Sequence, residues 1–299
     1  MPYALVLHCN MQNGFISHED LQGQKTLALF LQELIQKQDP ALATMLHAPK
    51  NSKPFTTAIL KPLGSNGLGR SEEKRPTHRS KASYSDQGEM KMRLTLLDDA
   101  LYPLISQFFL QHIGGIPTLH LGRSALVISK VSVTSESGEP WAGFAAFETI
   151  LAQGTETETS WRMSFATPTA FKSGDADLPL PIPRLCFQSW LYSWDEYAPS
   201  PFFSDKGERK RFLEEVVEGQ VSVDFSQLRS AEQGFYFDGH RTRERGFTGV
   251  CRFSVKPTKI VPQHRHILGT LARYSFYAGT GRKTTMGMGV TGFMSSERK

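Results

Sequence analysis

The chain has 299 residues, 39% of them apolar, and its 34 Lys and Arg against 29 Asp and Glu give a net charge of +5. This length suits one large or two ordinary domains with a substantial core. No apolar run approaches the length of a membrane span, and MPYALVLHCN lacks the features of a signal peptide. The three cysteines, Cys9, Cys186 and Cys251, are too scattered for a disulfide framework or a zinc ribbon. We therefore expect a cytoplasmic protein without a bound metal or other cofactor.

The positive charge is concentrated in two regions. Residues 50–93 carry ten Lys and Arg against four Asp and Glu, and residues 240–283 carry ten against one, so the rest of the chain has a net charge of −10. Two basic regions on an acidic body are typical of a surface that binds a polyanion. Solvated surface charge is the alternative for either region alone.

In chain order, the first half alternates between strand and helix signals. Short runs rich in branched apolar residues predict strands at 3–10, 55–60, 90–97 and 118–133, the last as a pair or one bent strand. Apolar residues at helical spacing predict helices at 25–38, which Asp39-Pro40 ends, and at 100–113. Residues 64–89, rich in Ser, Gly and charge, indicate a mobile loop or a long hairpin tip. The order β-α-β-β-α-β is that of a ferredoxin-like unit.

The same pattern returns in the second half, after a connecting segment at 141–153. Strands are predicted at 160–166, 221–225, 247–255 and 290–294, with a hairpin-like region between the second and the third. Helices are predicted at 184–197, 208–217 and 264–277. Trp161, Trp190 and Trp194 fall at apolar spacing and are predicted to lie in the core rather than to stack on bases. We predict an α+β fold of two tandem ferredoxin-like (RRM-like) domains, residues 1–138 and 139–299.

The stretch FYAGTGRKTTMGMGVTGF, residues 276–293, has five glycines within fourteen residues. Glycine permits positive φ, and backbone N–H groups in such loops can point at anionic oxygens. The adjacent cations Arg282 and Lys283 add positive charge at the same place. This combination is typical of a loop that holds a phosphate. A P-loop would need Gly where Arg282 stands, and the later G-x-G-x-x-G has no room for a following helix. A flexible linker is the alternative to a phosphate-holding loop. The residues predicted to contact RNA here are Gly279, Gly281, Arg282, Lys283 and Thr284.

The sequence GTGRKTTMGMG, preceded by LARYSFYAG, resembles the C-terminal glycine-rich loop of the RAMP superfamily. More narrowly, it resembles that of the CRISPR repeat-processing endoribonucleases. The resemblance implies binding of CRISPR repeat RNA and metal-independent cleavage of precursor crRNA. A non-catalytic RAMP-type crRNA-binding subunit of a CRISPR effector complex, with other subunits as partners, is the alternative, and a general RNA-binding module is a third. A monomer and a homodimer are both compatible with the sequence.

Metal-free RNA cleavage needs a base for the 2′-OH, an acid for the leaving 5′-oxygen and cations for the phosphate. His47, in MLHAPKNSK, suits proton transfer and falls in what reads as a loop, with Lys50 and Lys53 close behind. The resembling family places a histidine on or just after the first helix, with a lysine a few residues later. The resemblance thus implies His47 and Lys53 as catalytic, with Lys50 as an RNA contact. The family's helix tyrosine is missing here, and His18 is the rival histidine.

Two further basic clusters are candidates for RNA binding. Arg241, Arg243 and Arg245 alternate in GHRTRERG, so an extended backbone would place them on one face, where they could track an RNA backbone. His264 and Arg265 lie near a predicted helix start and are predicted to contact a phosphate or a base. A solvated hairpin tip and ordinary surface placement are the respective alternatives.

Overall fold

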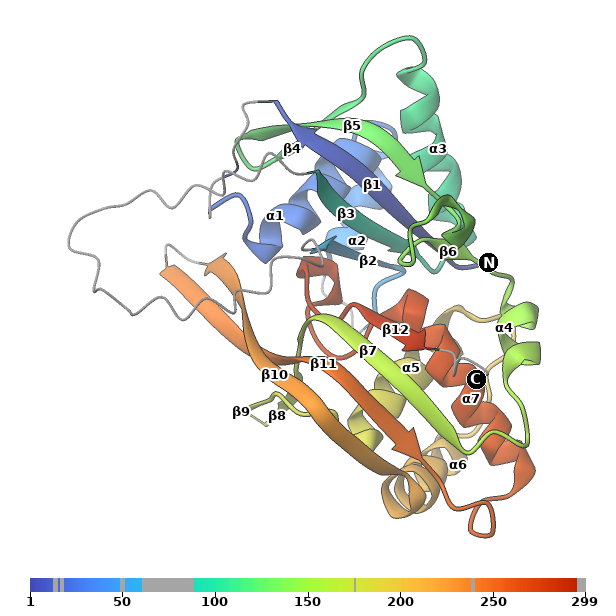
Figure 1. Cartoon of the computed structure of the whole chain (residues 1–299). Coiled ribbons are helices and arrows are strands. Elements are labelled where there is room, and N and C mark those ends of the chain that lie inside the picture. Colours follow the sequence, from blue (N-terminus) through green and yellow to red (C-terminus); the bar gives the residue numbers. More distant parts are fainter. Residues whose placement is uncertain are drawn as a thin grey trace, which may run out of the picture.

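The computed structural model describes residues 1–12, 16, 19–48, 52–60, 89–174, 176–237 and 240–294. In this part of the chain, two antiparallel sheets lie one above the other in Figure 1, each with helices on one face. The first sheet comes from the N-terminal half and the second from the C-terminal half. The segment expected to be a loop at 64–89 lies, apart from residue 89, outside the described residues.

β1 (Tyr3–Met11) is the centre of the first sheet. It pairs antiparallel with β3 (Met90–Leu96) on one side and β5 (Ser124–Ser132) on the other. β2 (Phe55–Leu60) and β4 (Thr118–Leu121) complete the order β2-β3-β1-β5-β4. The strands predicted in this half are confirmed, and the segment 118–133 is a hairpin of two strands.

The pleat of β1 gives the first sheet two different faces. Leu5, Leu7 and Cys9 point to the helices and join the core of the first unit. Val6 points the other way, into a small apolar cluster that also holds Val290 from the C-terminal half. The same strand therefore contributes both to its own core and to the contact between the two halves.

The helix expected at 25–38 is present in two parts. α1 (Gly23–Ala28) continues without a break into the π-helical segment η1 (Leu29–Ile35). Phe30 and Leu34 of η1 are fully buried, and the ring of Phe30 stacks on that of Phe55 at 4.1 Å between centroids.

A second helix, α2 (Pro40–His47), follows where the sequence was expected to form a loop. Asp39 Oδ1 accepts a hydrogen bond from the backbone N of Leu42 at 2.9 Å, so Asp39 caps the helix. Pro40 stands in the first turn, where its missing N–H costs nothing. The Asp-Pro pair thus starts one helix as it ends another. The loop prediction for His47 was wrong, because this residue ends a helix.

The second unit repeats the topology of the first. Its sheet has the order β10-β11-β7-β12. Its main elements are β7 (Ser160–Thr169), α5 (Pro183–Tyr197), β10 (Ser222–Phe237), β11 (His240–Ser254), α7 (Pro262–Ala278) and β12 (Thr291–Met294). Both units therefore have the predicted β-α-β-β-α-β order.

The hairpin of β10 and β11 is much longer than expected. Its register runs from Ser222 opposite Ser254 to Phe237 opposite His240, whereas the sequence predicted strands only near its base. The outer part projects beyond the rest of the sheet (Figure 1). The strand signal of this part is weak, because most of its residues are polar and its aromatic residues, at 235–237, are consecutive rather than alternating with polar ones.

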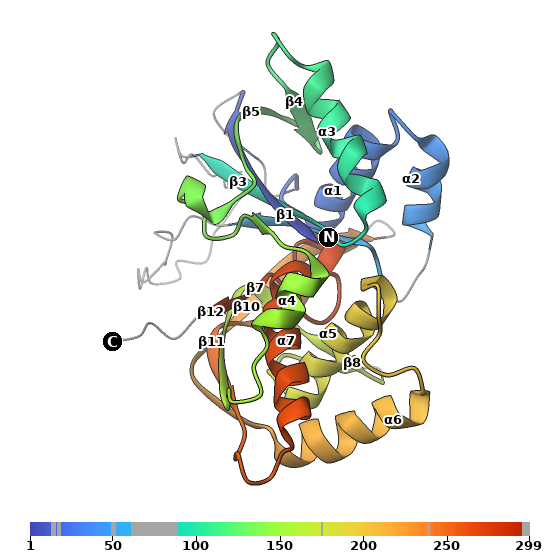
Figure 2. The same cartoon turned by 90° about the vertical axis from the view of Figure 1, so that its right-hand side faces the viewer.

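Shorter elements complete the described part of the chain. The strand β6 (Gly143–Phe144) pairs with β1 and so adds to the first sheet. The domain boundary after residue 138 stays a prediction. Figure 2 shows α4 (Phe147–Gln153) lying beside α7. The shorter elements are, in chain order, η2 (Asp99–Leu101), α3 (Tyr102–Gln111), η3 (Ser135–Ser137), β6 (Gly143–Phe144), α4 (Phe147–Gln153), β8 (Phe171–Ser173), β9 (Ala176–Leu178), α6 (Lys206–Arg211), η4 (Phe212–Glu218) and η5 (Thr284–Met286).

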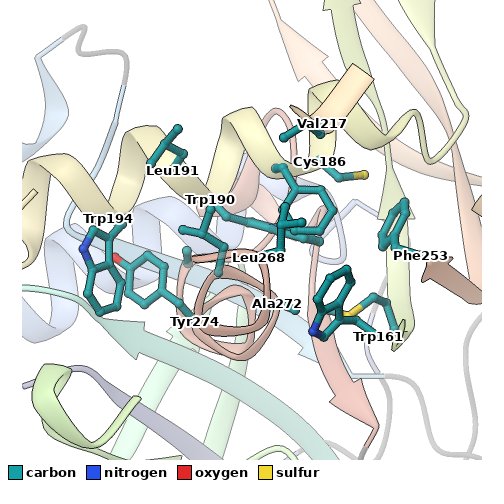
Figure 3. Close-up of a cluster of buried hydrophobic side chains, with 14 of the residues drawn as sticks. Trp161, Cys186, Trp190, Leu191, Trp194, Val217, Phe253, Leu268, Ala272 and Tyr274 are labelled. Atoms are coloured by element: carbon teal, nitrogen blue, oxygen red, sulfur yellow. The ribbon is translucent and has the colours of Figure 1, made fainter. Parts of the chain in front are cut away.

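Aromatic side chains fill the core of the second unit. Trp161 and Trp190 are fully buried and Trp194 is 2% exposed, so their prediction as core residues is confirmed. Trp194 of α5 meets Tyr274 of α7 edge to face at 5.2 Å between ring centroids (Figure 3). This packing fixes α7 against α5, and α7 in turn carries the glycine-rich stretch at its end.

A buried arginine joins the two units. Arg93 of β3 is 1% exposed and donates hydrogen bonds to the carbonyl oxygens of Trp141, at 2.9 Å, and Phe276, at 2.6 Å. Its guanidinium lies 4.6 Å from the ring centroid of Phe276. Phe276 is in the last turn of α7, whose carbonyls lack helical partners. The first unit therefore holds the helix end from which the glycine-rich stretch begins.

Candidate nucleic-acid interface

The glycine-rich stretch forms a tightly folded loop between α7 and β12, which we call the glycine loop (residues 279–290). Gly281 has φ of +78°, and a Cβ there would lie 2.3 Å from the carbonyl oxygen of Ala170, so no other residue fits. Lys283 also has a positive φ, of 56°, the one such non-glycine residue in the described part of the chain. Strained backbone of this kind persists where the surroundings hold it in place.

Hydrogen bonds within the protein account for most of the loop's backbone donors. Nine N–H groups, those of residues 279–282 and 286–290, donate to acceptors in the same chain. Among them, the N–H of Gly281 bonds to Ser189 Oγ at 3.1 Å and that of Arg282 to the Ala170 carbonyl at 3.0 Å. These groups would reach an RNA phosphate only if the loop rearranged, so its side chains are the better candidates for anion contact.

The glycine loop also docks on the first unit, a contact that the sequence did not indicate. The hydroxyl of Thr57, in β2, lies 2.6 Å from the carbonyl oxygen of Thr285, and the N–H of Gly287 donates to the Thr57 carbonyl at 2.9 Å. A Cβ on Gly23 would come within 2.2 Å of the Met286 carbonyl oxygen. The start of α1 and strand β2 therefore form a seat for the loop.

The two loop cations lie against acidic side chains. Lys283 Nζ forms an ion pair with Glu244 Oε1 of β11 and lies 4.0 Å from the ring centroid of Phe235 in β10. Arg282 forms ion pairs with Asp177 of β9 and, at 3.5 Å, with Glu244. Glu244 was not among the predicted site residues, although it is the one acidic residue in the basic region 240–283.

The three hairpin arginines share a face of β11, as their alternation predicts. Arg243 and Arg245 are 60% and 76% exposed, and each lies 3.2 Å from a carboxylate oxygen of Glu232 on β10. Hydrogen bonds from Arg245 and Arg243 lower the pKa of Glu232. Arg241 is exposed nearer the tip. The strand pleat puts Glu244 on the opposite face, toward the glycine loop.

His264 and Arg265 lie at the other end of α7 from the glycine loop. The 17-residue helix α7 separates them from Gly279 by roughly 20 Å, at about 1.5 Å per residue. Arg265 donates to the carbonyl oxygens of Glu156, Pro257 and Ile260. Burial lowers the pKa of His264. The structure therefore does not bring this pair to the loop, and its contact with RNA stays a prediction.

His47 and Lys53 are brought together at the end of α2. His47 is exposed, and the Lys53 ammonium donates to the carbonyl oxygens of the residues on either side of it, Leu46, at 2.8 Å, and Ala48. One lysine thus fixes the backbone that carries the imidazole. Lys50 and the rival His18 both lie outside the described residues.

Two further properties concern the described residues only. They contain no group of three or more His, Cys, Asp or Glu side chains arranged to hold a metal ion. None of their helices has the length and apolar character needed to cross a membrane.

The fold places this protein in a structural class, and its similarity to known proteins shows the family to which it belongs. Two ferredoxin-like units, the second with a glycine loop before its last strand, have the architecture of RAMP-type proteins. The model of the CRISPR Cas6 N-terminal domain matches residues 1–152, more than half of the chain, and that of the CRISPR-associated endoribonuclease Cas6 matches residues 163–291. The chain therefore belongs to the Cas6 family of CRISPR-associated endoribonucleases, and the resemblance seen in the sequence is confirmed.

Curated relatives and solved structures agree with this assignment. The chain is 31% identical to a Streptococcus thermophilus Cas6 over 144 residues and 29% identical to one from Mycobacterium tuberculosis over 171 residues. These matches span about half of each relative, 54% and 48%. Among solved structures, Thermus thermophilus Cas6 has a TM-score of 0.68 at 25% identity, with 98% of both chains covered. A Cas6 product complex has a TM-score of 0.73 at 26% identity, covering 98% of this chain and 100% of that one. The predicted fold class is thus confirmed.

Proposed function

We propose that this protein is an endoribonuclease that binds CRISPR repeat RNA and cleaves precursor crRNA without a metal ion. Membership of the Cas6 family supports the substrate class. One observation supports the catalytic part of the proposal. His47 is exposed, and the Lys53 ammonium donates hydrogen bonds to the backbone carbonyls of the residues on either side of it. A histidine placed this way presents an imidazole, the side chain most often used as a general acid or base, to solvent on a fixed backbone.

In this proposal, the 2′-OH beside the scissile bond attacks the neighbouring phosphorus and the 5′-oxygen leaves. The products are a 2′,3′-cyclic phosphate and a 5′-OH. His47 takes the proton from the 2′-OH or supplies one to the leaving oxygen, and solvent water makes the other proton transfer, so that one proton is lost and one gained. The role of His47 is worth about 10²- to 10⁴-fold in rate. Lys53 positions His47 through the backbone and places a positive charge beside the reacting phosphate.

RNA binding in this proposal uses the hairpin and the glycine loop. The exposed side chains of Arg241, Arg243 and Arg245 form a row of cations on one face of a strand that projects from the sheet. Arg282 and Lys283 add two cations at the seat between the two units. Such contacts to phosphates position an RNA without reading its sequence.

A cleavage assay with repeat RNA in EDTA tests the proposal. We expect one cut, with a cyclic phosphate at the new 3′ end. A repeat with a single 2′-deoxy nucleotide before the cut should bind as tightly as the all-RNA form and remain intact, because it lacks the attacking hydroxyl. Cleavage of the deoxy substrate, or a requirement for Mg²⁺, would exclude this mechanism. Tight binding of the all-RNA repeat with no cleavage would favour the non-catalytic crRNA-binding subunit.

A further inference from the structure

The ion pairs under the glycine loop raise the question of how it could accept a phosphate. The side chains of Lys283 and Glu244 are only 18% and 13% exposed, and Arg282 is 26% exposed with a second carboxylate, Asp177, on its other side. Two cations meet two carboxylates here. The loop therefore presents much less net positive charge to RNA than its sequence suggests.

The contacts of Glu244 place its carboxylate where an anionic ligand of Lys283 and Arg282 would bind. Its Oε1 atom receives both Lys283 and Arg282, while its Oε2 atom is buried and accepts no hydrogen bond among the described residues. A buried carboxylate oxygen without a donor costs stability. The pleat of β11 holds the side chain on the loop side of the hairpin, whose other face carries the arginines paired with Glu232.

A carboxylate and a phosphodiester each spread one negative charge over two oxygens, and lysine and arginine bind both through charge-assisted hydrogen bonds. We propose that Glu244 is a built-in competitor for RNA: in the free protein its carboxylate occupies the place on Lys283 and Arg282 that an RNA phosphate takes on binding. The inference rests on the proposed RNA binding and adds an inhibitory contact to it. Lys283 can make the exchange because its long flexible side chain can turn from one anion to another.

The exchange has a consequence for the salt dependence of binding. A cation that neutralises a phosphate on a single strand contributes about 0.7 to the slope of log affinity against log salt. In the wild type, Lys283 gives up one anion to gain another, so its net contribution is small. Removing the charge of Glu244 takes this competing anion away from Lys283, so that its contact with a phosphate no longer replaces this ion pair. The competitor therefore lowers affinity for every RNA that reaches the loop, whatever its sequence.

The test is Glu244→Gln, which keeps the size of the side chain and removes its charge. We expect repeat RNA and poly(U) of equal length to bind about fivefold more tightly at low salt, the size of one partly exposed charge interaction. The salt slope should steepen by about 0.7. In a chain carrying Lys283→Ala, the same substitution should give a smaller gain. Binding is measured by fluorescence anisotropy at several salt concentrations, after thermal melting has shown that each variant folds.

Glu158→Gln is the matched control. Glu158 pairs with Arg273 at 2.8 Å, and these side chains are 21% and 18% exposed, close to the values of the Glu244–Lys283 pair. The control makes the same change in net charge and loses a similar ion pair, and RNA affinity should not change. If Glu244→Gln fails to fold, Asp177→Asn removes one of the two carboxylates that pair with Arg282. It should give a smaller gain, because Asp177 is more exposed and Glu244 still pairs with Arg282.

Three results would overturn the proposal. One is an unchanged affinity and slope for a folded Glu244→Gln protein, which would make the ion pair purely structural. Another is an equal gain in Glu158→Gln, which would assign the effect to net charge. The third is weaker binding by Glu244→Gln, which would mean that the carboxylate holds the loop in its binding shape. Failure of the wild type to bind either RNA would instead contradict the proposed function itself.

Discussion

At the scale of single residues, the end of α2 is built around one cation that lies between two carbonyls. Lys53 Nζ contacts the carbonyl oxygens of Leu46 and Ala48, so its removal would free the backbone on both sides of His47. The last carbonyls of a helix have no helical partner, and a lysine is well suited to satisfy them. Lys53 therefore holds the backbone on both sides of His47.

Replacement of His47 by alanine should lower the single-turnover cleavage rate by roughly 10²- to 10⁴-fold, the range for one acid–base group. RNA affinity should change little, because a neutral imidazole adds little to ground-state binding. His120→Ala is the control, since His120 is also an exposed histidine of the first unit, 56% exposed and 3.5 Å from Glu33, and it should leave the rate unchanged. Wild-type cleavage by His47→Ala together with loss of cleavage in His18→Ala would transfer the role to His18.

At the scale of elements, the glycine loop is held by its own backbone and by its two neighbours. Residues of β7 and the following turn accept its N–H groups on one side, and β2 docks it on the other. A loop fixed in this way presents Arg282 and Lys283 in one arrangement. The backbone shape of the loop therefore requires its glycines. Substitution of a glycine should distort the loop and weaken RNA binding although no charge is removed.

Gly281→Ala tests this shape requirement. The added Cβ would lie 2.3 Å from the Ala170 carbonyl oxygen at a φ of +78°, so both a clash and backbone strain are expected. Gly138→Ala is the control, because Gly138 has φ of +79° and no atom within 4 Å of the added Cβ. The control should lose about 1 kcal/mol in the free energy of unfolding, from backbone strain alone. Gly281→Ala should lose more, and should also weaken RNA binding. Equal losses in denaturant unfolding would show that the contact with Ala170 does not constrain the loop.

At the scale of the whole molecule, the two ferredoxin-like units are tied together just before the glycine loop and again within it. Arg93 holds the last turn of α7, and Thr57 holds residues 285 and 287. Burial lowers the pKa of Arg93 to about 9, which leaves the guanidinium charged at pH 7. The first unit thus sets the position of the loop that the second unit carries, and the unfolding of the two units should be coupled.

Arg93→Ala should uncouple the units. It leaves the buried carbonyls of Trp141 and Phe276 without their donor and opens a cavity, for which we expect a loss of about 3 kcal/mol in the free energy of unfolding. Arg252→Ala, at an exposed position of β11, should cost under about 0.5 kcal/mol. In differential scanning calorimetry, the single transition of the wild type should broaden or divide in two. A single sharp transition at the wild-type temperature would show that Arg93 does not couple the units.

The order of strands and helices could be predicted from the sequence because its signals are local. Alternation in 90–97, apolar spacing in 264–277 and the burial of Trp190 each depend on residues within a few positions of one another. The same locality explains two errors. Asp39-Pro40 can end a helix and can also begin one. The outer part of the long hairpin lacks the alternation of apolar and polar residues that reveals a strand.

The state of the candidate site depends on contacts between residues far apart in the chain. Glu244 precedes Lys283 by 39 positions, and Thr57 precedes Thr285 by 228. Whether a cation is exposed, as Arg245 is, or paired against a buried carboxylate, as Lys283 is, depends on which strand face it occupies and on what packs there. The sequence alone therefore determined the fold, the family and the basic character of this surface. Only the tertiary structure decided which charges are free to meet RNA, because the docking of the two units and the pleat of β11 bring the opposing carboxylates to them.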